Sequence, residues 1–274
     1  MLSYRHEFHA GNVGDLIKHA ILSSIITYLQ QKPAPIRYID THAGPGLYAT
    51  TSAMAEKTGE YKCGVGSIPL EEFPEQLQAY RDVLAEFVAD QQYPGSPLLA
   101  AKLLRSQDEL RLFELHSSEY PRLQELFKRD RRVQVGNSDG FASVKALLPV
   151  KNSRALILID PSFEVKTDYE AVVTCIKNGY ARMPNAVFAV WYPVIGNPAL
   201  DVMIKNIAAL VNEKLWRFEL SASDRDTAGG MTATGMLVIN PPWILASDME
   251  AAFQSLCKHL PFETTSFTAE CLKP

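Results

Sequence analysis

The sequence lacks the features expected of a membrane, disulfide-rich or zinc-binding protein. Its four cysteines, Cys63, Cys175, Cys257 and Cys271, include no C-x-x-C pair, which argues against both a disulfide framework and a zinc site. No apolar run is long enough to cross a bilayer, and the N-terminus lacks the pattern of a signal peptide. We therefore expect a reduced, cytoplasmic protein without a metal ion.

Other absences narrow the functional class. A phosphate loop of the G-x-x-x-x-G-K type is missing, which leaves an ATPase with little support. The net charge of −4 argues against a general nucleic-acid coat protein but permits a local basic patch. There is no internal repeat, and the 47% apolar content predicts a folded core. The 274 residues suit one large domain, or one domain with an insertion.

Short apolar runs alternate with helical patterns along the chain. This alternation predicts an α/β domain with a mostly parallel sheet. The last two expected strands are separated by residues 221–234, which have no helical period, so an antiparallel hairpin is expected there. The seven expected strands cover residues 36–40, 110–115, 132–135, 155–160, 186–191, 215–220 and 235–240.

The first expected strand runs directly into the turn THAGPG, in which Gly44 and Gly46 permit a tight bend. A nucleotide-like cofactor binds at such a turn in doubly wound folds, although a simple strand-to-helix turn has the same pattern. In a compact unit an acid for the ribose follows roughly 20 residues later. Here the next strand with a terminal acid ends near Glu114. Residues 50–95 are therefore expected to form an inserted helical subdomain within a single domain, 1–274.

Acidic residues close several of the expected strands. Asp40, Glu114 and Asp160 end apolar runs, and Asp139 follows another run by a short loop. One such acid is usually a helix cap, but the ends of parallel strands meet at a single edge, where ligands bind. Without a phosphate-binding lysine motif, the pattern favours S-adenosylmethionine. Glu114 would bind the ribose hydroxyls, Asp139 the adenine amino group, and the glycine turn the methionine end.

The tetrapeptide Asp160-Pro161-Ser162-Phe163 follows five apolar residues. Methylation of an adenine amino group needs an acceptor for its N–H bonds, because the nitrogen lone pair is delocalised into the ring. Asp160 can accept such a bond and take up the proton, and the carbonyl beside Pro161 can accept the second N–H. Phe163 offers a flat face to a base removed from its stack. The structural alternative is an exposed turn with Phe163 in the core.

A second tetrapeptide, Asn240-Pro241-Pro242-Trp243, matches the D/N/S-P-P-Y/F/W tetrad of amino-methyltransferases better on local pattern. Chain order nevertheless favours Asp160. If the glycine turn follows strand one, the catalytic tetrad belongs on strand four, which ends at Asp160. Asn240 instead ends the last expected strand.

Longer motifs give a specific resemblance that covers nearly the whole chain. They are MLSYRHEFHAGNVGDLIKH, YIDTHAGPGLY, TGEY, YPGSPLLA, ELHSSEYPRL, SDGF, LILIDPSFEVKTDY, WYPV and GMTATGMLVINPPW. With these motifs the sequence resembles the RlmJ family, which methylates adenine N6 in 23S ribosomal RNA. The resemblance implies a class I S-adenosylmethionine-dependent methyltransferase of Rossmann-like fold with an inserted helical subdomain, and 23S rRNA as its partner.

The resemblance also implies roles for individual residues. Asp160 would be the catalytic acceptor, and Tyr4, Arg5 and His6 would form an N-terminal flap over the substrate. The family tetrad usually reads D-P-P-Y, whereas this chain has D-P-S-F. Phe163 therefore keeps the ring without its hydroxyl, and Ser162 lacks a proline ring. The S-adenosylmethionine site would be lined by Lys18, His19, His42, Ser96, Glu114, Asp139 and Gly140.

Three further patterns have simpler readings. Ser96 and the proline after it suit a helix start, either as a plain cap or as an anion site. His6, His9 and His19 fit no standard zinc spacing and are expected to line the cofactor and RNA cleft. The basic run at residues 128–132 is interpreted as a solvated loop, with a phosphate contact as the alternative.

The sequence thus predicts a monomeric adenine-N6 methyltransferase of 23S rRNA that works by direct in-line transfer. Two rivals stay open. One is a non-catalytic RNA-binding module of the same fold, which Ser162 permits. The other is the same chemistry on DNA adenine or on a protein glutamine amide. Asp160 counts against glutamine, because that reaction usually accompanies asparagine at the first tetrad position.

Overall fold

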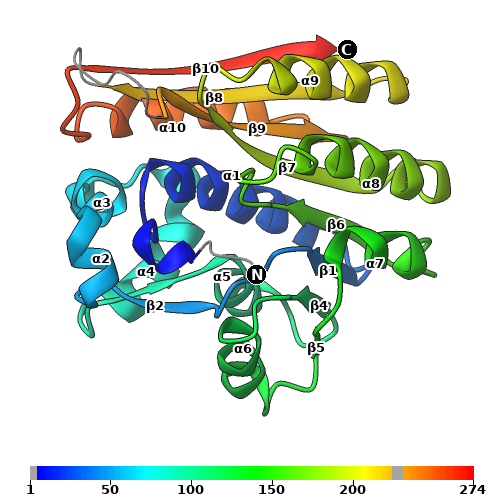
Figure 1. The fold of residues 1–274 in the computed structure, drawn as a ribbon, viewed down its shortest axis with the longest axis horizontal. Helices are drawn as coiled ribbons and strands as arrows, with labels where there is room; N and C mark the ends of the chain where they lie inside the picture. Colours follow the sequence, from blue (N-terminus) through cyan, green and yellow to red (C-terminus); the bar gives the residue numbers. More distant parts are fainter. Residues whose placement is uncertain (1–4, 224–230) are drawn as a thin grey trace.

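The structure is a computed structural model that describes residues 5–223 and 231–274, and within these residues an eight-stranded mixed sheet forms the centre (Figure 1). The strand order is β10-β8-β9-β7-β6-β1-β4-β5. The five strands from β7 to β5 run parallel, whereas β9 and β10 pair antiparallel with their neighbours. The strands are β1 (Ile36–Asp40), β4 (Glu109–Phe113), β5 (Val133–Gly136), β6 (Arg154–Ile159), β7 (Val187–Val194), β8 (Leu215–Ser223), β9 (Ala233–Ile239) and β10 (Thr264–Lys273).

The predicted fold class, including the antiparallel β8–β9 hairpin, is confirmed, but the predicted number of strands is wrong. The additional strand is β10, which pairs with β8 at the edge of the sheet. Its side chains alternate between exposed and half-buried positions, so it lacks the apolar run that marks a central strand. The expected loop 221–234 was also too long, because β8 continues to Ser223 and β9 starts at Ala233.

Helices cover both faces of the sheet, and the strand residues alternate between two buried clusters. Tyr38 of β1 packs in the cluster that contains the helices α1, α4, α5 and α10. Its neighbour Ile39 packs in the cluster that contains α7, α8 and α9, as expected for successive side chains of a strand. The helices are α1 (Val13–Gln30), α4 (Gln78–Val88), α5 (Ser96–Leu103), α6 (Glu119–Phe127), α7 (Gly140–Leu147), α8 (Asp168–Arg182), α9 (Pro198–Leu210) and α10 (Leu245–Leu256).

The segment expected to form an inserted subdomain, residues 50–95, is mainly helical. A separate antiparallel ribbon of β2 (Leu47–Ala49) and β3 (Gln92–Pro94) brackets it. This ribbon brings the chain back to α5 beside the glycine turn, where the Gly95 amide donates to the Gly46 carbonyl at 2.9 Å. In Figure 1 the segment lies at one end of the molecule, beside α1. Between the two strands lie α2 (Ala53–Thr58), α3 (Glu60–Cys63), three short 3-10 helices and α4.

Candidate active site

The acids at the strand ends converge because β6, β1, β4 and β5 are adjacent parallel strands. Asp40 ends β1, and Glu114 and Asp160 directly follow β4 and β6. The Asp40 carboxylate is fully buried and accepts hydrogen bonds from the hydroxyls of Tyr38 and Ser96, both at 2.7 Å. Burial raises the pKa of Asp40 to about 6. Asp40 therefore orients the Ser96 side chain by a hydrogen bond, although Asp40 itself does not line the cavity.

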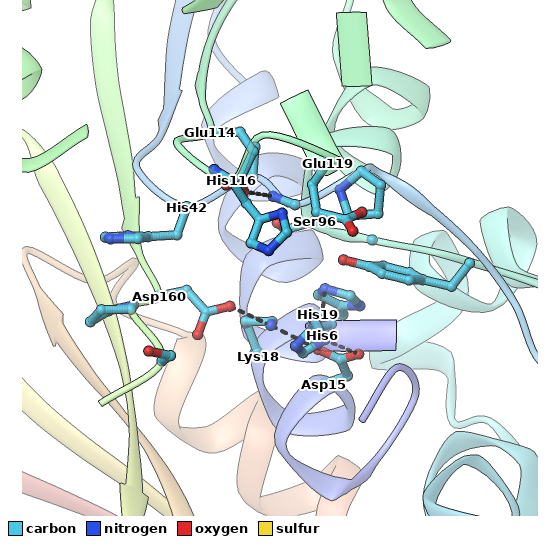
Figure 2. A pocket seen from close by; sticks show the side chains of 17 residues that line it. His6, Asp15, Lys18, His19, His42, Ser96, Glu114, His116, Glu119 and Asp160 are labelled. Atoms are coloured by element: carbon cyan, nitrogen blue, oxygen red, sulfur yellow. Dashed lines mark hydrogen bonds and ion pairs between the residues drawn. The ribbon is translucent and has the colours of Figure 1, made fainter. Parts of the chain in front are cut away.

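A cavity lies at this edge of the sheet, and Figure 2 shows the side chains around it. Its wall comes from His6, the start of α1, the glycine turn, the start of α5 and the loops after β4 and β6. The carboxyl edge of a parallel sheet is the usual ligand site of such folds. The wall brings together these residues predicted from the sequence: His6, Lys18, His19, His42, Gly44, Ser96, Glu114, Asp160 and Pro161.

Lys18 joins two carboxylates across the cavity floor (Figure 2). Its Nζ atom lies 2.5 Å from Oδ2 of Asp160 and 2.7 Å from Oδ1 of Asp15. Burial favours neutral Lys18, but the two carboxylates outweigh it and raise the pKa of the ammonium group. In the described part of the chain, Oδ1 of Asp160 makes no hydrogen bond. That oxygen is therefore available to a ligand.

Asp15 also ties down the N-terminal segment, a role that the sequence analysis did not foresee. His6 Nε2 lies 3.0 Å from both Asp15 oxygens, and the Gly11 amide donates to Oδ2 at 2.7 Å. Burial opposes the ionised form, but His6 and Lys18 hold the pKa of Asp15 well below its usual value. The signal was the three-residue spacing of Asp15 and Lys18, which places both on one face of a helix.

Two imidazoles in the cavity wall are neutral at physiological pH. Burial lowers the pKa of His19 to about 3 and that of His42 to about 4. His19 Nδ1 lies 2.6 Å from the Tyr93 hydroxyl, whereas its buried Nε2 has no hydrogen-bond partner among the described residues. The His42 ring meets the edge of Phe141 with the ring centroids 4.7 Å apart. Both histidines can therefore offer neutral hydrogen-bonding groups to a ligand.

The glycine turn and Glu114 are directly connected. The Gly44 amide donates to Oε2 of Glu114 at 2.8 Å, and the His116 amide donates to Oε1 at 2.6 Å. Burial raises the pKa of this carboxyl group against the effect of these bonds. Gly44 has φ +59°, and a Cβ atom there would lie 2.5 Å from the Tyr48 hydroxyl. A side chain at this position would therefore strain the backbone and displace the Tyr48 hydroxyl.

Several predicted residues do not line the cavity. Asp139 is exposed and caps α7, where its Oδ1 accepts from the Phe141 amide at 2.9 Å. Gly140 is buried against Thr41, and Gly46 packs against Leu126 of α6. Exposed Arg5 lies beside the insertion, with its Nη1 4.0 Å from Sδ of Met54. Tyr4 lies outside the described residues.

The start of α5 corrects one detail of the sequence analysis. Gly95 is the N-cap residue, and Ser96 lies inside the helix without capping it. The Ser96 hydroxyl instead donates to Oδ2 of Asp40. The serine before a proline therefore predicted the start of the helix correctly. The hydrogen-bond partner of Ser96, however, is Asp40 and not the backbone of the helix.

A second cavity adjoins the first and shares Lys18 and Asp160 with it. Phe163 borders this cavity but is only 6% exposed, and it packs against Tyr169 and Trp191 with ring centroids 4.7 and 6.1 Å away. Half-buried Trp191 also borders the cavity, and its Nε1 donates to the Thr234 hydroxyl at 2.8 Å. Trp191 belongs to the motif WYPV, but its sequence pattern did not indicate a place in the site.

The remaining predicted groups lie elsewhere. His9 borders the second cavity and its Nδ1 lies 2.8 Å from Oε1 of Glu60 in α3. Residues 128–132 precede β5, at the sheet edge opposite the acids, where Arg132 pairs with Asp130 at 2.6 Å. Among residues 5–223 and 231–274, no cluster of three or more His, Cys, Asp or Glu side chains could hold a metal ion. No helix within these same ranges is long and apolar enough to span a membrane.

The rival tetrapeptide is separated from the cavity by the direction of its strand. β9 runs antiparallel to β7, with Ile239 paired to Phe188, so Asn240 lies at the edge opposite Asp160. Its side-chain amide donates to the carbonyls of Pro184 and Ala186, both at 2.7 Å. Asn240 thus has a structural role there.

Comparisons with known proteins agree over the full chain. The family model described as ribosomal RNA large subunit methyltransferase D, RlmJ, matches residues 33–272. Ribosomal RNA large subunit methyltransferase J is 45% identical in Escherichia coli (strain K12) and 42% identical in Haemophilus influenzae (strain ATCC 51907), each covering 100% of both chains. A crystal structure of a Legionella pneumophila protein superposes with a TM-score of 0.88 at 34% identity, over 96% of this chain and 98% of that one. The chain belongs to the RlmJ family of ribosomal RNA large subunit methyltransferases.

Proposed function

We propose that the chain transfers a methyl group from S-adenosylmethionine to the N6 amino group of an adenine in 23S rRNA. The observation that carries this proposal is the position of Asp160. Its carboxylate lies where the two adjoining cavities meet, with Oδ2 bound to Lys18 and Oδ1 available. A donor in one cavity and an acceptor base in the other would both reach this carboxylate.

The first cavity suits S-adenosylmethionine. His19 presents a buried nitrogen without a partner among the described residues, and Glu114 stands at the glycine turn. A Cβ atom at Gly140 would lie 2.1 Å from the Thr41 carbonyl oxygen, so α7 starts in direct contact with the turn after β1. When bound, S-adenosylmethionine supplies a methyl group on a positively charged sulfur. His19, His42, Gly44, Ser96 and Glu114 would hold it, with Asp139 and Gly140 at the outer end.

The second cavity suits a base removed from its stack. Its wall combines polar groups near Asp160 with the apolar groups Phe163, Trp191 and Ile195. Base-modifying enzymes hold an extruded base between apolar faces and read its hydrogen-bonding edge. Because Phe163 is almost fully buried, Trp191 offers the more accessible ring for stacking. His6 borders both cavities, as an N-terminal flap over the substrate requires.

The chain's own groups then have separate tasks. Lys18 anchors one oxygen of Asp160, which turns the other oxygen toward the base. That oxygen accepts a hydrogen bond from one N–H of the adenine amino group and takes up its proton as the nitrogen gains a bond to the methyl carbon. The carbonyl beside Pro161 accepts a hydrogen bond from the second N–H. Positioning of the two reactants contributes the rest of the acceleration.

The exchange Asp160→Asn tests the catalytic assignment. It removes the proton acceptor but keeps an oxygen for Lys18, so kcat should fall about 10²–10⁴-fold while the Kd for S-adenosylhomocysteine changes little. Radiolabelled transfer to unmodified 23S rRNA and calorimetry measure the two quantities. Asn240→Ala, in the tetrapeptide at the opposite edge, is the matched control and should leave kcat unchanged. Wild-type turnover by Asp160→Asn would refute the role of Asp160.

Nucleoside mass analysis of the product separates this function from its rivals. N6-methyladenosine in 23S rRNA is expected, whereas methyl transfer only to DNA adenine or to a protein glutamine would identify another acceptor. Binding of both ligands without turnover on any RNA would identify a non-catalytic module. A monomeric state and a cytoplasmic location are parts of the same proposal.

A further inference from the structure

A buried chain of hydroxyl groups runs from the inserted segment to the cofactor cavity. The Tyr80 hydroxyl of α4 lies 3.0 Å from the Tyr93 hydroxyl of β3, which lies 2.6 Å from Nδ1 of His19 in α1. Tyr80 and Tyr93 have no exposed surface, and His19 is 1% exposed. The rings of His19 and Tyr93 are stacked, with centroids 5.5 Å apart. The inserted segment, through α4 and β3, therefore shares one buried hydrogen-bond chain with α1, which lies far from it in sequence.

The two directions of the chain leave different numbers of polar groups without a partner. If Tyr80 donates to Tyr93 and Tyr93 donates to His19 Nδ1, both hydroxyl protons are bound, and only the Nε2–H of His19 is left without a partner among the described residues. In the reverse direction His19 would donate to Tyr93 and Tyr93 to Tyr80, which leaves two groups without a partner among the described residues, the Tyr80 proton and the lone pair on His19 Nε2. A buried polar group without a partner costs about 1–3 kcal/mol. The first direction is therefore favoured.

This direction fixes which nitrogen of His19 carries its proton. A neutral imidazole has one N–H donor and one acceptor nitrogen, and His19 is neutral at physiological pH because burial lowers its pKa to about 3. With Nδ1 accepting from Tyr93, the proton is on Nε2. His19 lines the cavity, and its Nε2 has no partner in the described chain; the nearest acid oxygen, Oδ1 of Asp15, is 4.0 Å away.

We propose that Tyr80 and Tyr93 are positioning residues that hold His19 in its Nε2–H form, so that it donates a hydrogen bond to an anionic acceptor in the cavity. This inference rests on the proposed function, in which the acceptor is the carboxylate of the amino-acid end of S-adenosylmethionine. The inserted segment thereby contributes to cofactor binding, although it supplies neither Lys18 nor Asp160.

Nitrogen NMR of ligand-free protein labelled at histidine tests the tautomer directly. The chain has six histidines, and the variant His19→Gln assigns the signal of His19. We expect protonated Nε2 and unprotonated Nδ1 throughout the neutral pH range. A protonated Nδ1 in the wild-type protein would overturn the inference, and this measurement requires no ligand and no tyrosine variant.

The exchange Tyr93→Phe removes the donor to Nδ1 together with the acceptor of the Tyr80 proton. It should redistribute the His19 tautomers and raise the Kd for S-adenosylhomocysteine about tenfold, the equivalent of one hydrogen bond to a charged group. Tyr80→Phe leaves that donor in place but frees its orientation, so a smaller change in the same direction is expected. Unchanged tautomers and unchanged Kd in Tyr93→Phe would contradict the proposal.

Tyr61→Phe is the matched control. The Tyr61 ring lies against Tyr93 with centroids 6.2 Å apart, but its hydroxyl makes no hydrogen bond within the described residues. Neither the His19 tautomer nor the Kd should change, and an equal loss of affinity here would show that the tyrosines act only by packing. Failure of the wild-type protein to bind S-adenosylhomocysteine would refute the proposed function, while the tautomer would still be decided by NMR.

Discussion

Asp40 illustrates how burial changes the chemistry of a strand-end acid. The sequence grouped it with Glu114 and Asp160, because all three follow apolar runs. In the structure Asp40 has no exposed surface, and its Oδ2 accepts from the hydroxyls of Tyr38 and Ser96. Its burial, unlike its position at the end of a strand, depends on α5 and could not be predicted from spacing.

The raised pKa of Asp40 predicts a pH-dependent stability. Because the folded-state pKa is about 6 and the ordinary value is 3.8, the folded protein holds this proton more tightly than the unfolded chain. The stabilising contribution is complete below the ordinary value and is lost as pH rises through about 6. Urea unfolding of wild type and Asp40→Asn gives the difference in free energy of unfolding. Wild type should lose about 3 kcal/mol relative to the variant between acidic and neutral pH. A difference that is flat, or that rises with pH, would contradict the burial of this carboxyl.

At the scale of single residues the sequence identified chemical types better than contacts. Asp160, His19 and Glu114 were expected at the site, and the structure brings them to one cavity. Phe163 was expected as a stacking face, yet its ring is buried between neighbouring aromatic rings. A motif specifies the residue type, whereas exposure depends on what packs around it.

At the scale of elements, the contact between α7 and the turn after β1 depends on Gly140. A Cβ atom there would lie 2.1 Å from the Thr41 carbonyl oxygen and 2.6 Å from its Cα atom. Both are backbone atoms, so the helix itself would have to move. The motif SDGF was informative in sequence, but the contact that requires glycine appears only when α7 packs beside β1.

Gly140→Ala should therefore lower the free energy of unfolding by at least about 2 kcal/mol and weaken S-adenosylhomocysteine binding. Gly196→Ala is the matched control, because Gly196 has φ +68° with no atom within 4 Å of an added Cβ. Its cost should be about 1 kcal/mol, from backbone strain alone, with ligand affinity unchanged. Equal costs in urea unfolding would refute the close packing of α7.

Element type was predictable where the apolar pattern was strong. The central strands and α1 follow directly from their periodicity. β10 was missed because every second residue is exposed and the others are only half-buried. Its pairing partner β8 precedes it by about fifty residues, and such long-range pairing leaves little trace in local spacing.

At the scale of the whole molecule, the inserted segment and the sheet share one hydrophobic cluster. Phe73, Leu77 and Tyr80 of the insertion belong to the same buried cluster as Leu16 of α1 and Tyr38 of β1. The segment also binds the N-terminal region, through Glu60 with His9 and Asn12 at 2.8 and 2.9 Å. A shared core predicts a single cooperative unit rather than an independent lobe.

Hydrogen exchange in increasing urea measures this cooperativity. Amides of α4 in the insertion and of β6 in the sheet should merge into one global opening with the same denaturant dependence. Exchange of α4 through a separate opening of lower free energy would show that the insertion unfolds alone. The inserted segment would then be a domain in its own right.

The sequence by itself determined the fold class, the glycine turn and the position of Asp160 at the end of a central strand. Each depends on local patterns or on the order of strands along the chain. The tertiary structure decided which groups meet. The antiparallel direction of β9 places Asn240 at the edge of the sheet opposite Asp160. Packing brings Lys18 into ion pairs with Asp15 and Asp160. The tertiary structure also decided the surroundings of His19, because it places Tyr80 and Tyr93 beside that residue. Ionisation, tautomer and exposure depend on neighbours brought together by packing, and residue spacing alone does not specify those neighbours.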